Sequence, residues 1–331
     1  MPPVSTMPVS IANQTPTPLM HTLNRRRFAQ LTAGALLTTP FARAAAPAGK
    51  PNSKVGGVHI GINAPYSFGN AAMSAEDILK TCVQLNLSAI ELRTQPVEAQ
   101  LGAPANLTSA KNKVLPAGAA EDNAKQLRTW RETVDMEKVR AFRKHWETTG
   151  VFIEVIKVDG IFKMGESELD YAFTLAKALG ARGISTEISK SEDDHKRVGK
   201  FADKHKLHLA LHGHASTGPA HWEKAFAQGE YVGANVDLGH FVAGDHGSPV
   251  EFIKQHHKRI THVHIKDRKK GNGPNTPFGE GETPIGEVLR LIRDNKWPIQ
   301  ATIEFEYKVP ADSDRMKELA KAIKFCRDAL S

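Results

Sequence analysis

The chain has 331 residues, 40% of them hydrophobic and 24% charged, and its 44 Lys and Arg against 36 Asp and Glu give a formal net charge of +8. This length and composition predict a globular protein with a large core, either one large domain or two small ones. The two cysteines, Cys82 and Cys326, are too few for a thiolate metal cluster or a disulfide scaffold.

The first 44 residues have the order of regions of a twin-arginine export signal. The segment NRRRFAQ (24–30) leads into an apolar run up to Ala42, and Ala42-Arg43-Ala44 has the form of a cleavage site. We therefore predict a signal peptide over residues 1–44, recognition by the twin-arginine export machinery, and a periplasmic or otherwise exported protein. The apolar run is too short to span a bilayer permanently, so no membrane association is expected after processing. A chance basic patch before an amphipathic helix is the alternative.

Removal of this segment would take away four arginines and no acidic residue, lowering the formal net charge from +8 to +4. The remaining charges of both signs are interspersed, and no run of base-stacking aromatic residues accompanies them. The sequence therefore does not indicate a nucleic-acid partner.

After a linker at residues 45–56, strand-like and helix-like segments alternate to the end of the chain. The expected strands cover residues 57–63, 88–93, 151–158, 182–187, 207–212, 233–238, 259–266 and 299–305. The expected helices cover residues 74–85, 138–149, 167–179, 193–205, a short segment near Trp222, 249–257, 284–294 and 312–329. Eight strands, each followed by a helix, predict a (β/α)8 TIM barrel over residues 57–331. A doubly wound open sheet is less favoured because no Gly-rich phosphate loop follows the first strand.

Two connections, residues 94–134 and 268–283, are long enough to lie over the carboxyl end of the barrel as lids or substrate contacts. Both cysteines fall on apolar faces of expected helices, which favours buried thiols. Because the first and last helices of a closed barrel are neighbours, a disulfide between Cys82 and Cys326 is the alternative in an exported protein.

The segment THVHIKD (261–267) has two chemically different faces. In a strand, the period of two places His262, His264 and Lys266 on one face and two aliphatic residues on the other. The same alternation occurs in residues 207–214, 234–240 and 301–306. Polar side chains that come late on parallel strands converge at one end of a barrel, which is where such barrels carry their chemistry.

Four of these side chains, His212, Asp237, His264 and Glu304, form a candidate metal site. A divalent ion needs imidazole and carboxylate ligands on rigid elements with one position open for substrate, and this set suits Mn, Co, Zn, Ni or Mg. Taken singly, Glu304 could form a salt bridge and each His could be an ordinary buried residue. Together they would leave several unpaired polar groups in one barrel mouth unless something binds them.

Four motifs extend this pattern: NVDLGH (235–240), HVHIKD (262–267), PFGEGETPI (277–285) and IEFE (303–306). They resemble the xylose isomerase-like barrels, which include sugar phosphate isomerases and epimerases and the endonuclease IV relatives. The resemblance covers residues 57–329. In the ketose 3-epimerases of this family, a Glu, an Asp, a His and a second Glu hold a divalent metal. Asp237, His264 and Glu304 match three of them, but the first Glu falls on His212.

The resemblance implies removal of a proton next to a carbonyl, with the metal stabilising an enediolate. We expect Glu304 to be the base, Glu187 or His214 to be the acid, and Lys266 to polarise a substrate oxygen. An ion pair with Glu304 or Glu306 is the alternative for Lys266. We expect His240 and His262 to orient ligands, and Glu91 and Lys157 to form structural pairs.

Three functions fit these residues. The first is a metal-dependent sugar isomerase or epimerase, and the second is a lyase acting on 3-keto-glycosides by the same enolate chemistry. The third is a non-catalytic carbohydrate-binding barrel. Export favours a neutral sugar or glycoside over a sugar phosphate. A nuclease is disfavoured because it would need three metals and a markedly basic face.

Overall fold

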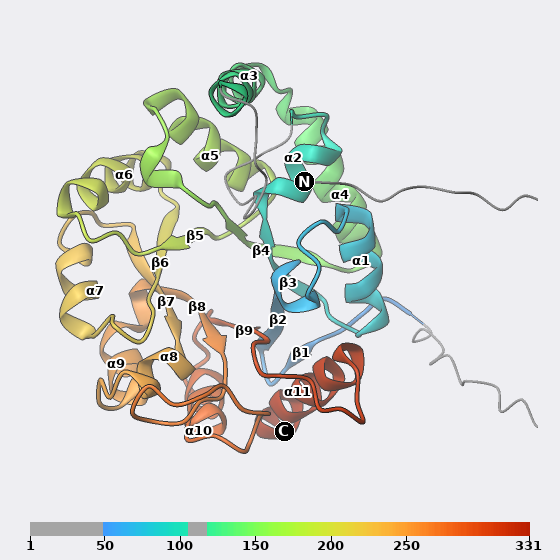
Figure 1. Cartoon of the computed structure of the whole chain (residues 1–331), viewed down its shortest axis with the longest axis vertical. Coiled ribbons are helices and arrows are strands. Elements are labelled where there is room, and N and C mark those ends of the chain that lie inside the picture. The colour runs from blue at the N-terminus through green and yellow to red at the C-terminus, as the bar shows by residue number, and fades with distance from the viewer. Residues whose placement is uncertain (1–48, 105–117) are drawn as a thin grey trace, which may run out of the picture. The chain divides into compact units, whose positions relative to one another are not determined.

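Eight parallel strands close into a barrel surrounded by helices (Figure 1). The computed structural model describes residues 49–104 and 118–331, so the expected signal peptide lies outside the described residues. The strands are β2 (Val58–Ala64), β3 (Ala89–Arg93), β4 (Phe152–Lys157), β5 (Gly183–Glu187), β6 (His208–His212), β7 (Val232–Asp237), β8 (Ile260–Ile265) and β9 (Gln300–Ile303). Each pairs in parallel with the next, and β9 pairs in parallel with β2, which closes the barrel. The predicted TIM barrel is confirmed.

The barrel strands are buried on both faces, as parallel strands covered by helices should be. All six residues of β8 are buried, including Val263 and Ile265 on the aliphatic face and His262 and His264 on the polar face. The polar face of β8 faces the barrel interior, where layers of side chains from neighbouring strands meet.

The helices follow the expected alternation, with three additions, α2, α3 and α8. The helices are α1 (Ala75–Gln84), α2 (Thr94–Gln100), α3 (Ala119–Thr133), α4 (Met136–Thr149), α5 (Glu166–Ala178), α6 (Glu192–His205), α7 (Pro219–Phe226), α8 (Leu238–Ala243), α9 (Pro249–His256), α10 (Ile285–Asp294) and α11 (Arg315–Leu330). Side-chain caps fix several of the starting points. For example, Ser74 accepts a hydrogen bond from the Asp77 backbone before α1, and Asp314 accepts one from Lys317 before α11.

The interpretation of residues 94–134 as one long polar connection was wrong at both ends. Residues 94–100 form α2 and residues 119–133 form α3, while residues 105–117 lie outside the described part. The polar composition concealed a buried ion cluster, in which Arg131 of α3 bonds to Glu98 of α2 at 2.8 Å and to Glu168 of α5 at 2.8 Å. These charges hold three helices together where apolar residues would ordinarily be expected.

Two further elements were not predicted. Within the expected linker, β1 (Lys54–Val55) pairs antiparallel with β2, and the buried Ser53 hydroxyl donates to the Ile60 carbonyl at 2.7 Å. The second half of that linker is therefore part of the folded unit. The short helix α8 begins directly after β7, because Asp237 caps it.

Both cysteines are buried free thiols, as the apolar faces of their helices predicted. Burial raises the pKa of the Cys326 thiol to about 12, so this group stays protonated and unreactive. The alternative of a Cys82–Cys326 disulfide is not found.

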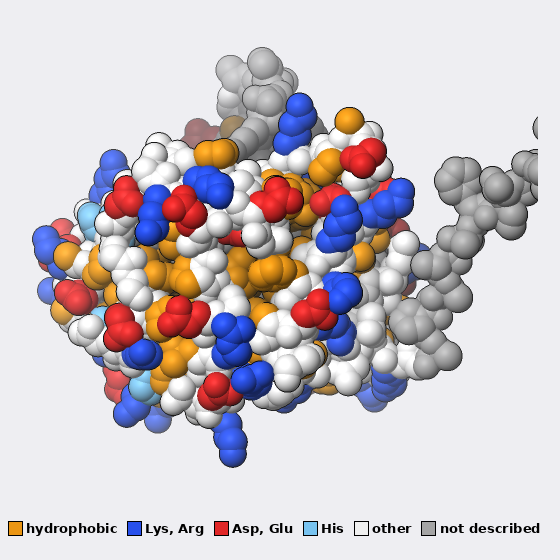
Figure 2. Space-filling view, turned by 90° about the horizontal axis from the view of Figure 1, so that it is seen from below, with side chains coloured by type: hydrophobic (Ala, Val, Ile, Leu, Met, Phe, Trp, Pro, Cys, Tyr) orange, Lys and Arg blue, Asp and Glu red, His pale blue; other side chains and the backbone are white. Residues whose placement is uncertain are grey.

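Lys, Arg, Asp and Glu side chains are interspersed on the face that Figure 2 shows, around apolar side chains near its middle. Among the helices of the described segments, none combines the length and the apolar character that crossing a membrane requires.

One ion pair at the amino-terminal end of the barrel predicts acid sensitivity. Glu154 of β4 accepts hydrogen bonds from Arg182 at 2.6 Å and from His59 at 3.2 Å. Burial alone raises the pKa of Glu154, but His59 and Arg182 outweigh it and lower the pKa to about 2. A lowered pKa stabilises the fold above the unfolded-state value of 4.5, and this stability is lost as the pH falls toward 2.

We expect Glu154→Gln to lower the free energy of unfolding at pH 7 by about 1–3 kcal/mol, because a charged hydrogen-bond partner is lost. Its stability should also fall less steeply than that of the wild type below pH 4.5, measured by urea denaturation at several pH values. The control is Glu137→Gln, which removes an exposed ion pair with Arg140 and should change little. Parallel pH dependence in Glu154→Gln and the wild type would contradict this account.

Candidate metal centre

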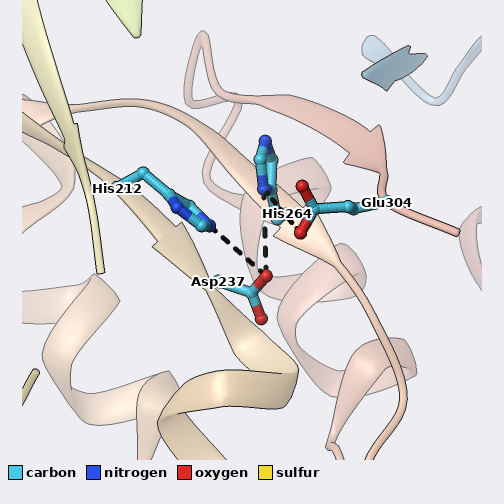
Figure 3. Close-up of side chains that lie close together, drawn as sticks. All are labelled: His212, Asp237, His264 and Glu304. Atoms are coloured by element: carbon cyan, nitrogen blue, oxygen red, sulfur yellow. Dashed lines mark ion pairs between the residues drawn. The ribbon is translucent and has the colours of Figure 1, made fainter. Parts of the chain in front are cut away.

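The four predicted ligands meet at the carboxyl end of the barrel (Figure 3). His212 ends β6, Asp237 ends β7, His264 lies near the end of β8, and Glu304 follows β9. One ligand atom from each residue lies within 4.8 Å of those of the other three. Strand register produces this convergence, because Asp237 is paired directly with His264 and Glu304 lies two residues beyond the partner of His264 on β9.

The inward-facing atoms are close to one another but unsatisfied. Asp237 Oδ2 lies 3.6 Å from His212 Nε2 and 3.8 Å from His264 Nδ1, which is itself 3.3 Å from Glu304 Oε2. All four atoms are buried, and none has a hydrogen bond among the described residues. Leaving a buried polar atom without a hydrogen bond costs about 1–3 kcal/mol, so this cluster favours a bound cation that all four atoms can contact.

The outward-facing atoms of the same residues are all held. Asp237 Oδ1 accepts from the His240 backbone at 2.8 Å, and Glu304 Oε1 accepts from Asn63 Nδ2 at 2.8 Å. The outer ring nitrogens of both histidines contact carboxylates. Each residue is thus fixed from outside and offers one atom inward, which is the arrangement that a divalent ion with imidazole and carboxylate ligands requires.

Lys266 supplies the positive charge nearest to this cluster. Its Nζ lies 3.0 Å from Asp237 Oδ2, 2.7 Å from Glu304 Oε2 and 2.7 Å from Glu306 Oε2. The first two contacts are ion pairs by distance without hydrogen-bond geometry, so Lys266 offsets part of the charge of both carboxylates. The alternative of an ion pair between Lys266 and Glu304 or Glu306 is found with both carboxylates. Although burial lowers the pKa of Lys266, the three carboxylates raise it above its usual range, so the amine stays charged.

The carboxylates and His264 have strongly shifted pKa values. Burial raises the pKa of Glu304, but the positive charges of His264 and Lys266 more than reverse this and hold it well below its usual range. Burial lowers the pKa of His264, yet Glu304 and Glu91 raise it to about 10. Both effects have one cause, which is that opposite charges meet in a buried site.

A cavity of about 630 Å³ opens above the cluster. Besides two of the ligands, its wall includes both candidate acids. The lining residues used below are Tyr66, Arg93, Lys157, Asp159, Glu187, His214, His240, Glu304 and Glu306. Sequence reasoning missed Tyr66, Arg93 and Asp159, although Arg93 and Asp159 lie at or just after the ends of β3 and β4, where barrel strands carry functional side chains.

Glu187 lies at the end of β5 and is held by three side chains. Its Oε1 accepts from Lys157 at 2.6 Å, and its Oε2 contacts His212 Nδ1 at 3.0 Å and His214 Nε2 at 2.8 Å. Burial raises the pKa of Glu187, but hydrogen bonds from the two histidines and the charge of Lys157 bring it far below its usual range. Glu187 therefore stays ionised. The side chain of His214 beside it is 56% exposed.

The residues expected to orient ligands have clear contacts. His240 has ring nitrogens 3.1 Å from Lys266 Nζ and 2.8 Å from an Arg268 nitrogen, and burial lowers its pKa to about 4. His262 lies deeper, with Nδ1 2.7 Å from the Thr261 hydroxyl. Glu91 and Lys157 were each expected to form a structural pair. Lys157 bonds to Glu187, and Glu91 contacts His264.

The connection 268–283 is anchored at one carboxylate. Asp267 accepts backbone hydrogen bonds from Gly279 at 2.8 Å, Gly281 at 2.9 Å and Thr283 at 3.2 Å. A Cβ at Gly281 would lie 1.9 Å from Asp267 Oδ1, so only glycine fits there. The PFGEGETPI motif is therefore explained as a loop wrapped around Asp267.

A substitution at Asp237 separates metal binding from folding. Asp237→Asn should keep the cap on α8, because asparagine is an equally good N-cap, while it removes the charge that faces the cluster. We expect affinity for divalent ions to fall by more than about 100-fold, since losing a ligand exceeds the ~10- to 100-fold effect of losing a group that orients one. Chelator competition measures this. Asp314→Asn, which alters the cap of α11, is the matched control, and equal metal affinity in both variants would contradict the assignment.

Comparison with known proteins agrees with the fold and with the carboxyl-terminal motifs. The family model described as "Xylose isomerase-like TIM barrel" matches residues 224–329, which contain Asp237, His264 and Glu304. Inosose dehydratase 2 of a Bacillus cereus strain is 27% identical over 164 residues, covering 43% of this chain and 54% of the relative. An inosose dehydratase of Bacillus thuringiensis (strain Al Hakam) gives the same identity and coverage. The matched region thus spans about half the length of these relatives.

Solved structures resemble almost the whole barrel. D-psicose 3-epimerase from Clostridium cellulolyticum H10 aligns with a TM-score of 0.58 and 11% identity, covering 83% of this chain and 100% of that one. The probable 3-DHS dehydratase AsbF from Bacillus anthracis aligns with a TM-score of 0.55 and 13% identity, covering 81% and 98%. At these identities the likeness shows the fold alone.

Proposed function

We propose that this protein is an exported, divalent-metal-dependent enzyme that removes a proton next to a carbonyl group of a carbohydrate. The observation that carries the proposal is the set of four buried, unsatisfied ligand atoms facing one point below an open polar cavity. Similarity to inosose dehydratases and to xylose isomerase-like barrels supports an activity on sugars or sugar-like rings.

His212, Asp237, His264 and Glu304 would hold the ion. Such an ion polarises a carbonyl oxygen and offsets the negative charge that develops when the adjacent C–H bond breaks. Glu304 is the candidate base, because it lines the cavity and its low pKa keeps it ionised. Asn63 fixes one of its oxygens, which limits how far the carboxylate can turn.

The remaining side chains supply a proton and a charge. His214 is the candidate acid, because it is exposed to the cavity and Glu187 holds its Nε2, which orients the ring. Lys266 stays cationic and lies 2.7 Å from Glu304, so it can also stabilise a negative substrate oxygen at that position. Glu187 is better suited to orienting His212 and His214 than to donating a proton, because its pKa lies far below its usual range.

Elimination fits this site better than epimerisation. Epimerisation needs a proton acceptor on each face of the substrate carbon. The position that carries the first Glu in ketose 3-epimerases is His212 here, and Glu187 beside it is tied to three partners. Elimination needs one base and one acid, and the relatives that are 27% identical over 164 residues are inosose dehydratases. We therefore favour a lyase, with an isomerase or epimerase as the second candidate.

The cavity favours a neutral substrate such as a 3-keto-glycoside. Its lining contains four carboxylates and only two permanent cations, Arg93 and Lys157. Arg93 pairs with Asp159 at 2.5 Å and Lys157 pairs with Glu187 at 2.6 Å. Lys266 pairs in the same way with Glu304 and Glu306. A phosphate group would therefore have to compete with these carboxylates for each cation, whereas sugar hydroxyls can both donate to the carboxylates and accept from the cations.

Deuterium exchange tests the reaction. The metal-loaded protein is incubated in deuterated water with a panel of ketoses and 3-keto-glycosides, and products are followed by mass spectrometry and NMR. We expect deuterium next to a carbonyl or release of an aglycone, and a loss of rate of about 100-fold or more in Glu304→Gln because the base is removed. Asp314→Asn is the control. Tight metal binding with no exchange and no release would point to a carbohydrate-binding barrel instead.

Export is tested separately from catalysis. The full-length protein is expressed in a bacterium with a twin-arginine pathway, and the periplasmic fraction is sequenced from its amino terminus. We expect a start near residue 45, since Ala42-Arg43-Ala44 has the form of a cleavage site. Replacing Arg25 and Arg26 by Lys should keep the protein in the cytoplasm. An unprocessed chain in the cytoplasm of the wild type would argue against the signal.

A further inference from the structure

Two carboxylates outside the ligand set, Glu91 of β3 and Glu187 of β5, contact the outer ring nitrogens of the imidazole ligands. Glu91 Oε2 lies 2.6 Å from His264 Nε2, and Glu187 Oε2 lies 3.0 Å from His212 Nδ1. We propose that these two outer carboxylates are positioning residues that fix the histidines in opposite tautomers around a centre for a single ion. The inference rests on the metal part of the proposed function and is independent of the reaction.

Glu91 determines which nitrogen of His264 is free. The carboxylate is fully buried, and an ionised carboxylate only accepts hydrogen bonds, so a contact of 2.6 Å requires a proton on His264 Nε2. Nδ1 is then the nitrogen that faces Asp237 and Glu304, and it would release its proton and supply the lone pair when an ion binds. Asn235 also approaches Nε2, at 2.9 Å, and a half-turn of its amide lets its oxygen share the same proton.

Glu187 imposes the opposite choice on His212. Its Oε2 requires a proton on His212 Nδ1, which leaves the Nε2 lone pair directed toward Asp237. Lys157 anchors the other oxygen of Glu187 at 2.6 Å and interacts electrostatically with Glu91 as well. The ion pair with Lys157 therefore fixes the Glu187 carboxylate in place beside His212.

The same contacts argue against additional ions. Glu91 with His262 and His264, and Glu187 with His212 and His214, each have the spacing of a metal site. In both groups, however, the shared histidine directs its N–H toward the carboxylate, so that nitrogen has no lone pair to give. The charge of Lys157 beside Glu187 further disfavours a second cation there. We therefore expect one ion per chain.

Losing a carboxylate that orients a histidine ligand typically weakens metal binding by about 10- to 100-fold. The test uses Zn²⁺ as the probe, with metal content and chelator competition measured on the wild type, Glu91→Gln and Glu187→Gln. We expect one Zn²⁺ per wild-type chain and a loss of affinity in that range for each variant. Glu168→Gln, which alters another buried carboxylate paired with Arg131, should bind Zn²⁺ as the wild type does.

Nitrogen NMR of the Zn²⁺-loaded wild type measures the tautomer of each histidine directly and needs no variant. If Glu91 and Glu187 served only to stabilise the fold, opposite tautomers would not be expected. Long-range ¹H–¹⁵N spectra should show one zinc-bound histidine protonated at Nε2 and one protonated at Nδ1. Any one of three results would overturn the inference: the same tautomer in both histidine ligands, two ions per chain, or unchanged affinity in both variants. None of them would contradict the proposed reaction. A wild type that binds no Zn²⁺ would instead overturn the metal centre itself, and this inference with it.

Discussion

Four buried polar atoms that face one point, with no hydrogen bond from the described part of the chain, are the constraint on which the rest of the site depends. Their desolvation is unfavourable, so the surrounding structure has to hold them in place from outside. It does so with a backbone amide, an asparagine side chain and two glutamates. The rigidity that a metal centre needs is therefore supplied by contacts outside the cluster of candidate ligand atoms.

The closed parallel barrel makes this arrangement possible. Neighbouring strands are in register, so Glu187 lies beside His212 and Asp237 lies beside His264. Residues that come late on successive strands then form a continuous band of polar groups around one end of the barrel. Asp237 also serves as the N-cap of helix α8, because the oxygen that does not face the cluster accepts a hydrogen bond from the His240 backbone.

Much of the fold and the ligand set could be predicted from the sequence, because both depend on local periodicity. The period of two in residues 261–267 shows which side chains share a face, and the end of each strand shows where they meet. The contact of Glu91 with His264 could not be predicted in this way. Glu91 reaches His264 across the barrel, 173 residues away in the sequence, and no local pattern records such a contact.

Helix α3 was missed for a related reason. Its residues look like a polar loop, and only the structure shows that Arg131 is buried between two glutamates from other helices. A charge whose partners are distant in sequence looks like a solvated residue until the partners are known. Apolar residues reveal their burial by periodicity, whereas buried ion pairs do not.

The charge balance around Lys266 finally bears on the chemistry. Lys266 and His264 both stabilise the ionised form of Glu304, which lowers the pKa of this carboxyl and makes it a weak base. A weak base removes a proton only from a carbon that the site has made acidic. In the proposed reaction, with Glu304 as the base, most of the driving force would then come from polarisation of the substrate carbonyl. The same balance favours the proposed elimination, because a leaving group that departs as the C–H bond breaks removes the negative charge that develops on the carbon.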